Sequence, residues 1–180
     1  YVENMYNIPI IGIIEPTVNY IMKNKTYKDI GIIATRGTIR SNTWEKELKS
    51  RIHNINIYSK ECPLLAPMAE EGWTQNEIAT LTIKEYLKDL PKLDALILGC
   101  THYPLFESTI KKELGNVDII NTGKIIAKYL CEYLYYDKNE TKENSRNKTD
   151  EIYLTDTECN FVKVANNILE SKVKIKHVII

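Results

Sequence analysis

The hydrophobic positions of this chain form short continuous runs, and longer amphipathic stretches separate them. The runs IGIIAT at 30–35 and ALILGC at 95–100 are apolar almost throughout, as parallel strands covered on both faces are. The same pattern predicts strands at Ile8–Ile14, Asp29–Thr35, Ile55–Ser59, Asp94–Gly99, Val117–Asn121, Glu151–Thr155 and Lys174–Ile180.

Between these runs, apolar residues recur with the spacing of a helix face. Helices are expected at Thr17–Lys23, Arg40–His53, Gln75–Asp89, Phe106–Leu114, Lys124–Tyr135 and Cys159–Ser171. Strands that alternate with helices build right-handed βαβ units, so the expected fold class is α/β, with an open, mostly parallel sheet flanked by helices. Ligands of such sheets bind beyond the carboxyl ends of the strands, and residues placed there are the first candidates for a site.

The charges exclude two classes of partner. The 180 residues include 24 basic and 24 acidic ones, so the formal charges cancel. This balance provides no basic surface for nucleic acid and no polybasic patch for a membrane. The longest apolar run, at 8–14, falls far short of the roughly 18 residues that a membrane-spanning helix needs. Residues 137–150 contain no apolar side chain, which indicates a solvated loop or linker.

The cysteines favour a reducing compartment over a metal or disulfide framework. Four cysteines are present, none in a C-x-x-C pair, so we expect no metal site and a cytoplasmic location. Cys131 falls in the middle of a predicted helix and is expected in the core. Cys62 precedes Pro63 in a predicted turn, and Cys159, near a helix start, is expected to be structural.

The candidate chemistry gathers in the sequence CTHYP at 100–104, where a predicted strand ends. Cys100 follows this strand directly, and Pro104 suits the opening of a helix. Backbone N–H groups at a helix start stabilise anions, so we expect a lowered pKa for the Cys100 thiol and a thiolate that acts as base or nucleophile. His102 could orient this thiol or share its proton. In the alternative interpretation, Cys100 is a small buried hydrophobe and His102 a structural histidine.

Other strand ends carry weaker signals. Thr35, Gly37 and Thr38 lie between a predicted strand and a predicted helix, which suits an anion, unless Thr38 and Ser41 only cap that helix. The first apolar run ends at Glu15.

Two more polar positions remain ambiguous from the residues alone. Glu70 and Glu71 are either solvated, or one of them reaches a catalytic histidine and raises its basicity. Thr101 offers a ligand its N–H and hydroxyl, or it caps a helix.

Four segments together resemble the glutamate racemases of the aspartate/glutamate racemase superfamily. They read IPIIGIIEP, IGIIATRGTIRSNTWEKEL, CPLLAPMAEEG and LILGCTHYPL, and their order and spacing fit along nearly the whole chain. The last segment is the most specific of them. The tail IYLTDTECNFVKVANNIL is similar to the family's closing strand and helix.

This resemblance implies a fold of two pseudo-symmetric α/β domains that each supply one cysteine to an active site between them. The implied reaction interconverts L- and D-glutamate without cofactor or metal, and D-glutamate then enters bacterial peptidoglycan. One thiolate removes the α-proton, and the other thiol returns a proton to the opposite face.

Carried over by position, the resemblance makes Cys100 the acid/base of the second domain. It gives His102 the role of assisting Cys100 or polarising the substrate carboxylate, and Glu70 that of supporting the histidine. It assigns substrate binding to Thr35, Thr38 and Thr101. A homodimer is the assembly that it implies.

The sequence departs from the family pattern at its beginning. The DSGxGG segment and the first cysteine motif of the family, of the type CNT, do not occur. With an opening YVENMYN that reads like the tail of a helix, this leads us to expect that the N-terminal part is absent and that the chain alone is inactive. The implied boundaries are 1–27 for the end of the first domain, 28–122 for the second domain, and 123–180 for a connecting helix, polar loop and C-terminal segment that returns to the first domain.

Three alternatives remain open from the sequence. The chain could belong to a racemase of aspartate or a related amino acid, or to a Cys-His acyl-transfer enzyme with Cys100 as nucleophile. It could also be a non-catalytic domain that only binds a small acid.

Overall fold

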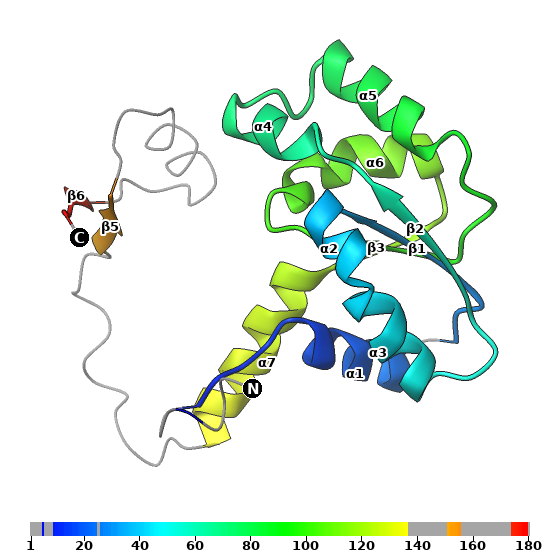
Figure 1. Cartoon of the computed structure of the whole chain (residues 1–180), viewed down its shortest axis with the longest axis horizontal. Helices are drawn as coiled ribbons and strands as arrows, with labels where there is room; N and C mark the ends of the chain where they lie inside the picture. Colours follow the sequence, from blue (N-terminus) through cyan, green and yellow to red (C-terminus); the bar gives the residue numbers. More distant parts are fainter. Residues whose placement is uncertain (1–4, 6–8, 25, 137–150, 156–173, 180) are drawn as a thin grey trace.

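The computed structural model describes residues 5, 9–24, 26–136, 151–155 and 174–179. Its main sheet has four parallel strands in the order β2-β1-β3-β4 (Figure 1). The strands are β1 (Asp29–Ala34), β2 (Asn56–Glu61), β3 (Ala95–Leu98) and β4 (Asp118–Asn121). The α/β fold class and the parallel sheet are therefore confirmed.

Helices cover both faces of this sheet, which explains why its central strands β1 and β3 are apolar at nearly every position. One face packs against α1 (Ile14–Asn24), α3 (Thr43–Arg51) and α7 (Thr122–Tyr136). The other face packs against α4 (Leu65–Glu70), α5 (Glu77–Leu87), the 3-10 helix η1 (Tyr103–Phe106) and α6 (Glu107–Leu114). Successive residues of a strand point to opposite faces, so each strand contributes to both cores.

Strand β3 shows this division most clearly. Ala95 and Ile97 belong to the core under α1 and α3, whereas Leu96 and Leu98 belong to the core under α5 and α6. All of them are fully buried. At about 25 cal/mol per Å² of apolar surface removed from water, these two cores supply most of the favourable free energy of folding.

The strand order creates a switch point between β1 and β3. From β1 the chain passes to β2 on one side, and it then returns to place β3 on the other side. The loops that follow β1 and β3 therefore leave in opposite directions, and the crevice between them is where sheets of this kind bind ligands. Thr35 begins the first of these loops, and Cys100 lies in the second.

The predicted strand at Ile8–Ile14 is wrong within the described residues. Residues 9–13 form no strand, and α1 begins at Ile14, where the Thr17 hydroxyl donates a hydrogen bond of 2.8 Å to the carbonyl oxygen of Ile13. A short apolar run fits a strand or a buried helix start equally well. Pro16 tips the balance, because proline is tolerated in the first turn of a helix.

The predicted helix at Arg40–His53 is two helices. The first, α2 (Arg36–Ser41), begins earlier than expected, and α3 follows it after Asn42. Asn42 has a φ of 54°, a left-handed conformation that asparagine tolerates better than most residues, so the chain turns there. The short helix α4 was not predicted.

Cys131 lies in α7 as predicted, but its side chain is exposed, so its expected place in the core is wrong. It follows Ile125, which packs against the core, by six residues. That spacing turns it about 240° around the helix axis, away from the sheet.

The C-terminal strands pair with each other. Strands β5 (Glu151–Leu154) and β6 (Lys174–His177) form a separate parallel pair, at two positions where strands were predicted. The predicted polar loop at 137–150 and helix at Cys159–Ser171 lie outside the described residues. None of the helices in the described part of the chain has the length and apolar character to span a membrane.

Candidate functional site

Gly99 allows the ends of β1 and β3 to approach closely. Its N–H donates a hydrogen bond of 2.8 Å to the carbonyl oxygen of Ile33. A methyl group on Gly99 would lie 3.1 Å from the Ala34 side chain and 3.2 Å from the Ile33 oxygen, closer than most real contacts of that kind. Because glycine has no side chain there, the loop that carries Cys100 leaves the sheet beside the loop that carries Thr35.

Cys100, His102 and Glu70 form a short chain of polar contacts. The Cys100 Sγ lies 3.7 Å from Nδ1 of His102, and the other ring nitrogen, Nε2, lies 3.3 Å from Oε1 of Glu70. With Nε2 protonated, the ring accepts the thiol proton at Nδ1 and faces the carboxylate with its N–H. Cys100 is half-buried, so solvent or a small molecule can reach it.

The contact between His102 and Glu70 serves orientation more than stability. The Glu70 side chain is 66% exposed and the His102 side chain 36%, and ion pairs this accessible stabilise a fold by about 0–1 kcal/mol. Glu70 is the last residue of α4, the helix that was not predicted. Of the two neighbouring glutamates, Glu70 is the one with this contact.

The turn that follows Cys100 is tied to the end of β2. Tyr103 N–H donates to the Cys100 carbonyl at 3.2 Å, and the buried Tyr103 hydroxyl donates to the Cys62 carbonyl at 2.7 Å. Burial raises the pKa of Tyr103 well above its usual value, so this hydroxyl keeps its proton. Pro104 lies in η1, so the predicted helix opens with a 3-10 turn.

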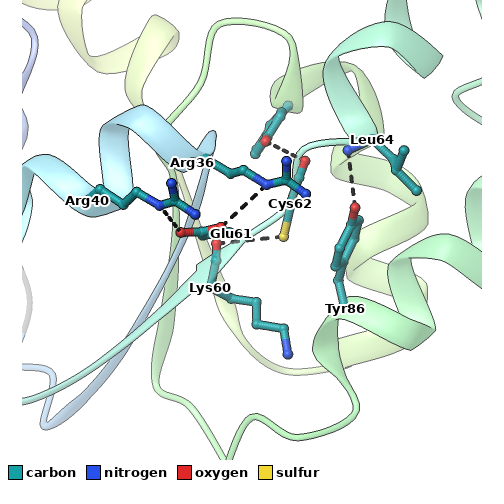
Figure 2. Close-up of polar contacts among 8 residues, drawn as sticks. Arg36, Arg40, Lys60, Glu61, Cys62, Leu64 and Tyr86 are labelled. Atoms are coloured by element: carbon teal, nitrogen blue, oxygen red, sulfur yellow. Dashed lines mark hydrogen bonds and ion pairs between the residues drawn. The ribbon is translucent and has the colours of Figure 1, made fainter.

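Figure 2 shows the same end of β2, where residues on both sides of Cys62 form polar contacts with neighbouring elements. Glu61 pairs with Arg40 at 3.0 Å and Arg36 at 3.6 Å, and the Tyr86 hydroxyl accepts a hydrogen bond of 3.1 Å from Leu64 N–H. Cys62 itself is fully buried. Burial raises the pKa of its thiol to about 12, so Cys62 is neutral at physiological pH and unsuited to act as a base.

The two threonines after β1 contact each other. The Thr35 and Thr38 hydroxyl oxygens lie 3.0 Å apart, and both side chains are half-buried. Thr35 occupies the position before α2, and its side chain makes no capping hydrogen bond to a backbone N–H of that helix. Thr38 and Ser41 lie inside α2 and do not cap its start. The Ser41 hydroxyl donates to the Thr38 carbonyl at 2.7 Å and accepts a hydrogen bond of 3.4 Å from the N–H of Thr43, the first residue of α3.

A pocket of about 190 Å³ adjoins Cys100. Its lining residues are Ile13, Ile14, Trp44, Gly99, Cys100, Thr101 and Thr122. Of the predicted site residues, Cys100 and Thr101 line it, whereas Thr35, Thr38, Glu70 and His102 do not. Thr35 and Thr38 lie on the neighbouring loop after β1. His102 and Glu70 connect to the pocket through the contact between His102 and Cys100.

Several lining residues were missed from the sequence. Thr122 directly follows β4, so the rule that points to the carboxyl ends of strands would have identified it; its hydroxyl donates to the Leu98 carbonyl at 3.1 Å. Ile13 and Ile14 come from the run taken for a strand. Trp44 carried no signal beyond its apolar character. Among the described residues, no group of three or more His, Cys, Asp or Glu side chains could hold a metal ion.

Residues 2–130 match the model of a protein family described as Asp/Glu/Hydantoin racemase. A glutamate racemase of Sulfurihydrogenibium sp. is 42% identical over 164 residues, which cover 90% of this chain and 60% of that protein. The chain thus spans less than two thirds of this relative's length.

Solved structures are similar over almost the whole chain. A glutamate racemase from Bacillus anthracis has a TM-score of 0.87 at 33% identity and covers 99% of this chain, which spans 68% of that one. A glutamate racemase from Francisella tularensis, solved in complex with D-glutamate, has a TM-score of 0.83 at 31% identity, with coverage of 99% and 66%. The chain belongs to the Asp/Glu/Hydantoin racemase family.

Proposed function

We propose that this chain provides one acid/base half of a glutamate racemase. The observation that carries the proposal is the chain of contacts from Glu70 through His102 to the half-buried Cys100, at the switch point of the sheet and beside a pocket. Support comes from the family match and from relatives that are named glutamate racemases.

Cys100 is the group that exchanges a proton with the substrate. In one direction its thiolate takes the α-proton, the bond between that hydrogen and Cα breaks, and the electron pair stays on the substrate, delocalised toward its carboxylate. His102 takes the thiol proton beforehand and is held for this by Glu70. In the other direction the Cys100 thiol gives its proton to Cα.

The carbanion needs stabilisation because the α-proton of an amino acid is a very weak acid. Fixed hydrogen-bond donors aimed at the substrate carboxylate supply part of it. We assign this role to Thr101, which lines the pocket, and to the hydroxyls of Thr35 and Thr38 at the neighbouring loop. A site screened from water strengthens each of these bonds.

Inversion at Cα requires a second acid/base group on the opposite face of the substrate. Cys62 is excluded from this role by its burial and its pKa of about 12. The chain spans 60% of the Sulfurihydrogenibium relative, and we propose that the second thiol belongs to the part of the fold beyond it. Residues 1–180 alone are then expected to be inactive.

The test is exchange of the α-hydrogen of glutamate in D₂O with the full-length enzyme, followed by NMR and chiral chromatography. We expect solvent deuterium in the product from both L- and D-glutamate, and loss of turnover in Cys100→Ser. Faster turnover of aspartate would assign the enzyme to that substrate instead. A covalent adduct on Cys100 in intact-mass spectra would indicate acyl transfer. Binding of glutamate without exchange would reduce the chain to an acid-binding domain.

Three broader assignments follow from the same proposal. The enzyme acts in the cytoplasm, supplies D-glutamate for peptidoglycan, and forms a homodimer. Light scattering of the purified protein tests the dimer, and rescue of a D-glutamate auxotroph by the full-length gene tests the cellular role.

A further inference from the structure

Trp44 places its indole nitrogen beside the reactive loop. It belongs to α3 and lines the pocket together with Gly99, Cys100 and Thr101. A methyl group on Gly99 would lie 3.4 Å from Nε1 of Trp44, so this nitrogen sits against the residue that precedes Cys100.

The N–H of this indole has no hydrogen-bond partner among the described residues, although only 5% of the side chain is exposed. None of the fully enclosed side-chain nitrogens and oxygens of these residues lacks a partner, so Nε1 is not sealed in the core. The pocket is the open space that Trp44 borders. Because Nε1 also adjoins Gly99, which lines the same pocket, the donor lies at the pocket wall.

This donor has no protein partner among the described residues, so it can bind an acceptor that enters the pocket. Indole nitrogen can only donate, so its partner must be an acceptor. An aromatic side chain without a ring nitrogen, such as phenylalanine, would fill the core without placing a donor at the pocket wall.

We propose that the Trp44 indole N–H is a substrate-binding group that donates a hydrogen bond to a carboxylate oxygen of the acidic substrate held beside Cys100. This inference rests on the proposed racemase function. The pocket of about 190 Å³ has room for part or all of a small acid. Much of the remaining wall is apolar, so the few polar groups of the lining, Trp44 Nε1 and Thr101 among them, fix the orientation of the substrate.

Kinetics of Trp44→Phe in the full-length enzyme test the proposal. Phenylalanine keeps an aromatic ring but removes the donor. A hydrogen bond to a charged acceptor is worth about 1.5–3 kcal/mol, so we expect KM to rise about tenfold or more. The same carboxylate is present in both enantiomers, so KM should rise equally for L- and D-glutamate.

Trp73→Phe is the matched control. Trp73 is the only other tryptophan of the chain, it is 46% exposed, and it lies outside the pocket lining. Its replacement should leave KM within twofold of the wild-type value. A KM for Trp44→Phe that is also within twofold of wild type would overturn the proposal.

A second measurement observes the indole N–H directly. With uniform ¹⁵N labelling of the full-length enzyme, the spectra of Trp44→Phe and Trp73→Phe identify the indole N–H signals of these two residues. D- or L-glutamate should shift the Trp44 signal saturably and leave that of Trp73 in place. A stationary Trp44 signal in an enzyme that racemises glutamate would refute the binding role alone, whereas absence of any α-hydrogen exchange would refute the racemase function and this inference with it.

Discussion

Two cysteines of this chain follow parallel strands, and the structure treats them in opposite ways. Cys62 comes directly after β2 and Cys100 comes two residues after the end of β3. Each is followed within four residues by a proline and then a helix. Yet Cys62 is fully buried with a thiol pKa of about 12, whereas Cys100 is half-buried, 3.7 Å from an imidazole nitrogen, and open to a pocket.

The difference shows that a strand end alone does not make a reactive thiol. What distinguishes the two positions is the environment that tertiary structure adds around each sulfur. Cys62 lies within the core under α4 and α5, and its backbone carbonyl anchors Tyr103. Cys62 therefore supports the turn that presents Cys100, and five experiments can break or sharpen this contrast.

The largest expected effect comes from replacing each thiol by a hydroxyl. Cys100→Ser should lower kcat of the full-length racemase about a thousandfold, because an alcohol at neutral pH is a far poorer base than a thiolate. Cys62→Ser should keep kcat within a few-fold of wild type. If the two variants lose equal activity while both remain folded by circular dichroism, the contrast between the cysteines is wrong.

Removing the imidazole should slow the reaction in one direction more than in the other. His102→Asn should lower kcat about ten- to a hundredfold in the direction in which Cys100 removes the α-proton, because the thiol then lacks its proton acceptor. Glu70→Gln should act in the same direction but more weakly, and Glu71→Gln is its matched control. Equal slowing of both directions by His102→Asn would argue against a role confined to Cys100.

Alkylation should separate the sulfurs without any substitution. Iodoacetamide should modify Cys100 more than about tenfold faster than Cys62, since Cys62 is accessible only after local opening of the core. Peptide mapping by mass spectrometry follows each cysteine, and the exposed Cys131 serves as an internal reference for an accessible thiol. Equal rates for Cys62 and Cys100 would show that burial does not protect Cys62.

The hydrogen bond from Tyr103 to the Cys62 carbonyl, which connects the end of β2 to the Cys100 turn, can be removed by substitution at Tyr103. Tyr103→Phe removes the hydroxyl from a buried hydrogen bond of 2.7 Å and leaves the Cys62 carbonyl without that donor, so we expect a loss of about 1–3 kcal/mol in the free energy of unfolding. Tyr86→Phe removes a solvent-accessible hydrogen bond to Leu64 and should cost less. Urea denaturation measures both variants, and equal losses would mean that the Tyr103 contact is not special.

The smallest expected effect concerns the stability of the fold at acidic pH. It depends on Glu107, the first residue of α6, which follows the Cys100 loop and η1. Burial would raise the pKa of Glu107, but hydrogen bonds from Lys111, Asn121 and Lys124 outweigh it and lower the pKa to about 2. Because the folded pKa lies below the ordinary glutamate value of 4.5, Glu107 stabilises the fold above about pH 4.5, and this contribution is lost as pH falls toward 2.

Glu107→Gln should reduce the loss in free energy of unfolding between about pH 4.5 and pH 2 by on the order of 1 kcal/mol. The effect is small because the lysine partners of Glu107 are exposed to solvent. Cys62→Ala should leave that limb unchanged, since a thiol with a pKa of about 12 is neutral throughout the acid range. An unchanged acid limb in Glu107→Gln would place the titrating group elsewhere.

The sequence by itself determined the α/β class, the four strands of the main sheet, and the residues that stand at the ends of β1 and β3. These features follow from local pattern, because burial on both faces makes a central strand such as β3 apolar throughout. Cys100, His102, Thr35 and Thr38 could thus be selected in advance, whereas Glu70 was singled out from Glu71 only by the family resemblance. The run at 8–14 could not be assigned correctly, because an apolar stretch of that length does not distinguish a strand from a pocket wall that leads into a helix.

Tertiary structure decided which of these residues meet. The order β2-β1-β3-β4 brings the loops after β1 and β3 together, and no local pattern encodes strand order. Tertiary packing also buries Cys62 and leaves Cys100 partly exposed. It places Glu70 in contact with His102, and Trp44 and Thr122 in the pocket lining. These outcomes depend on contacts between residues distant in the chain, where packing fixes exposure, and exposure with neighbouring charge fixes whether a thiol can ionise.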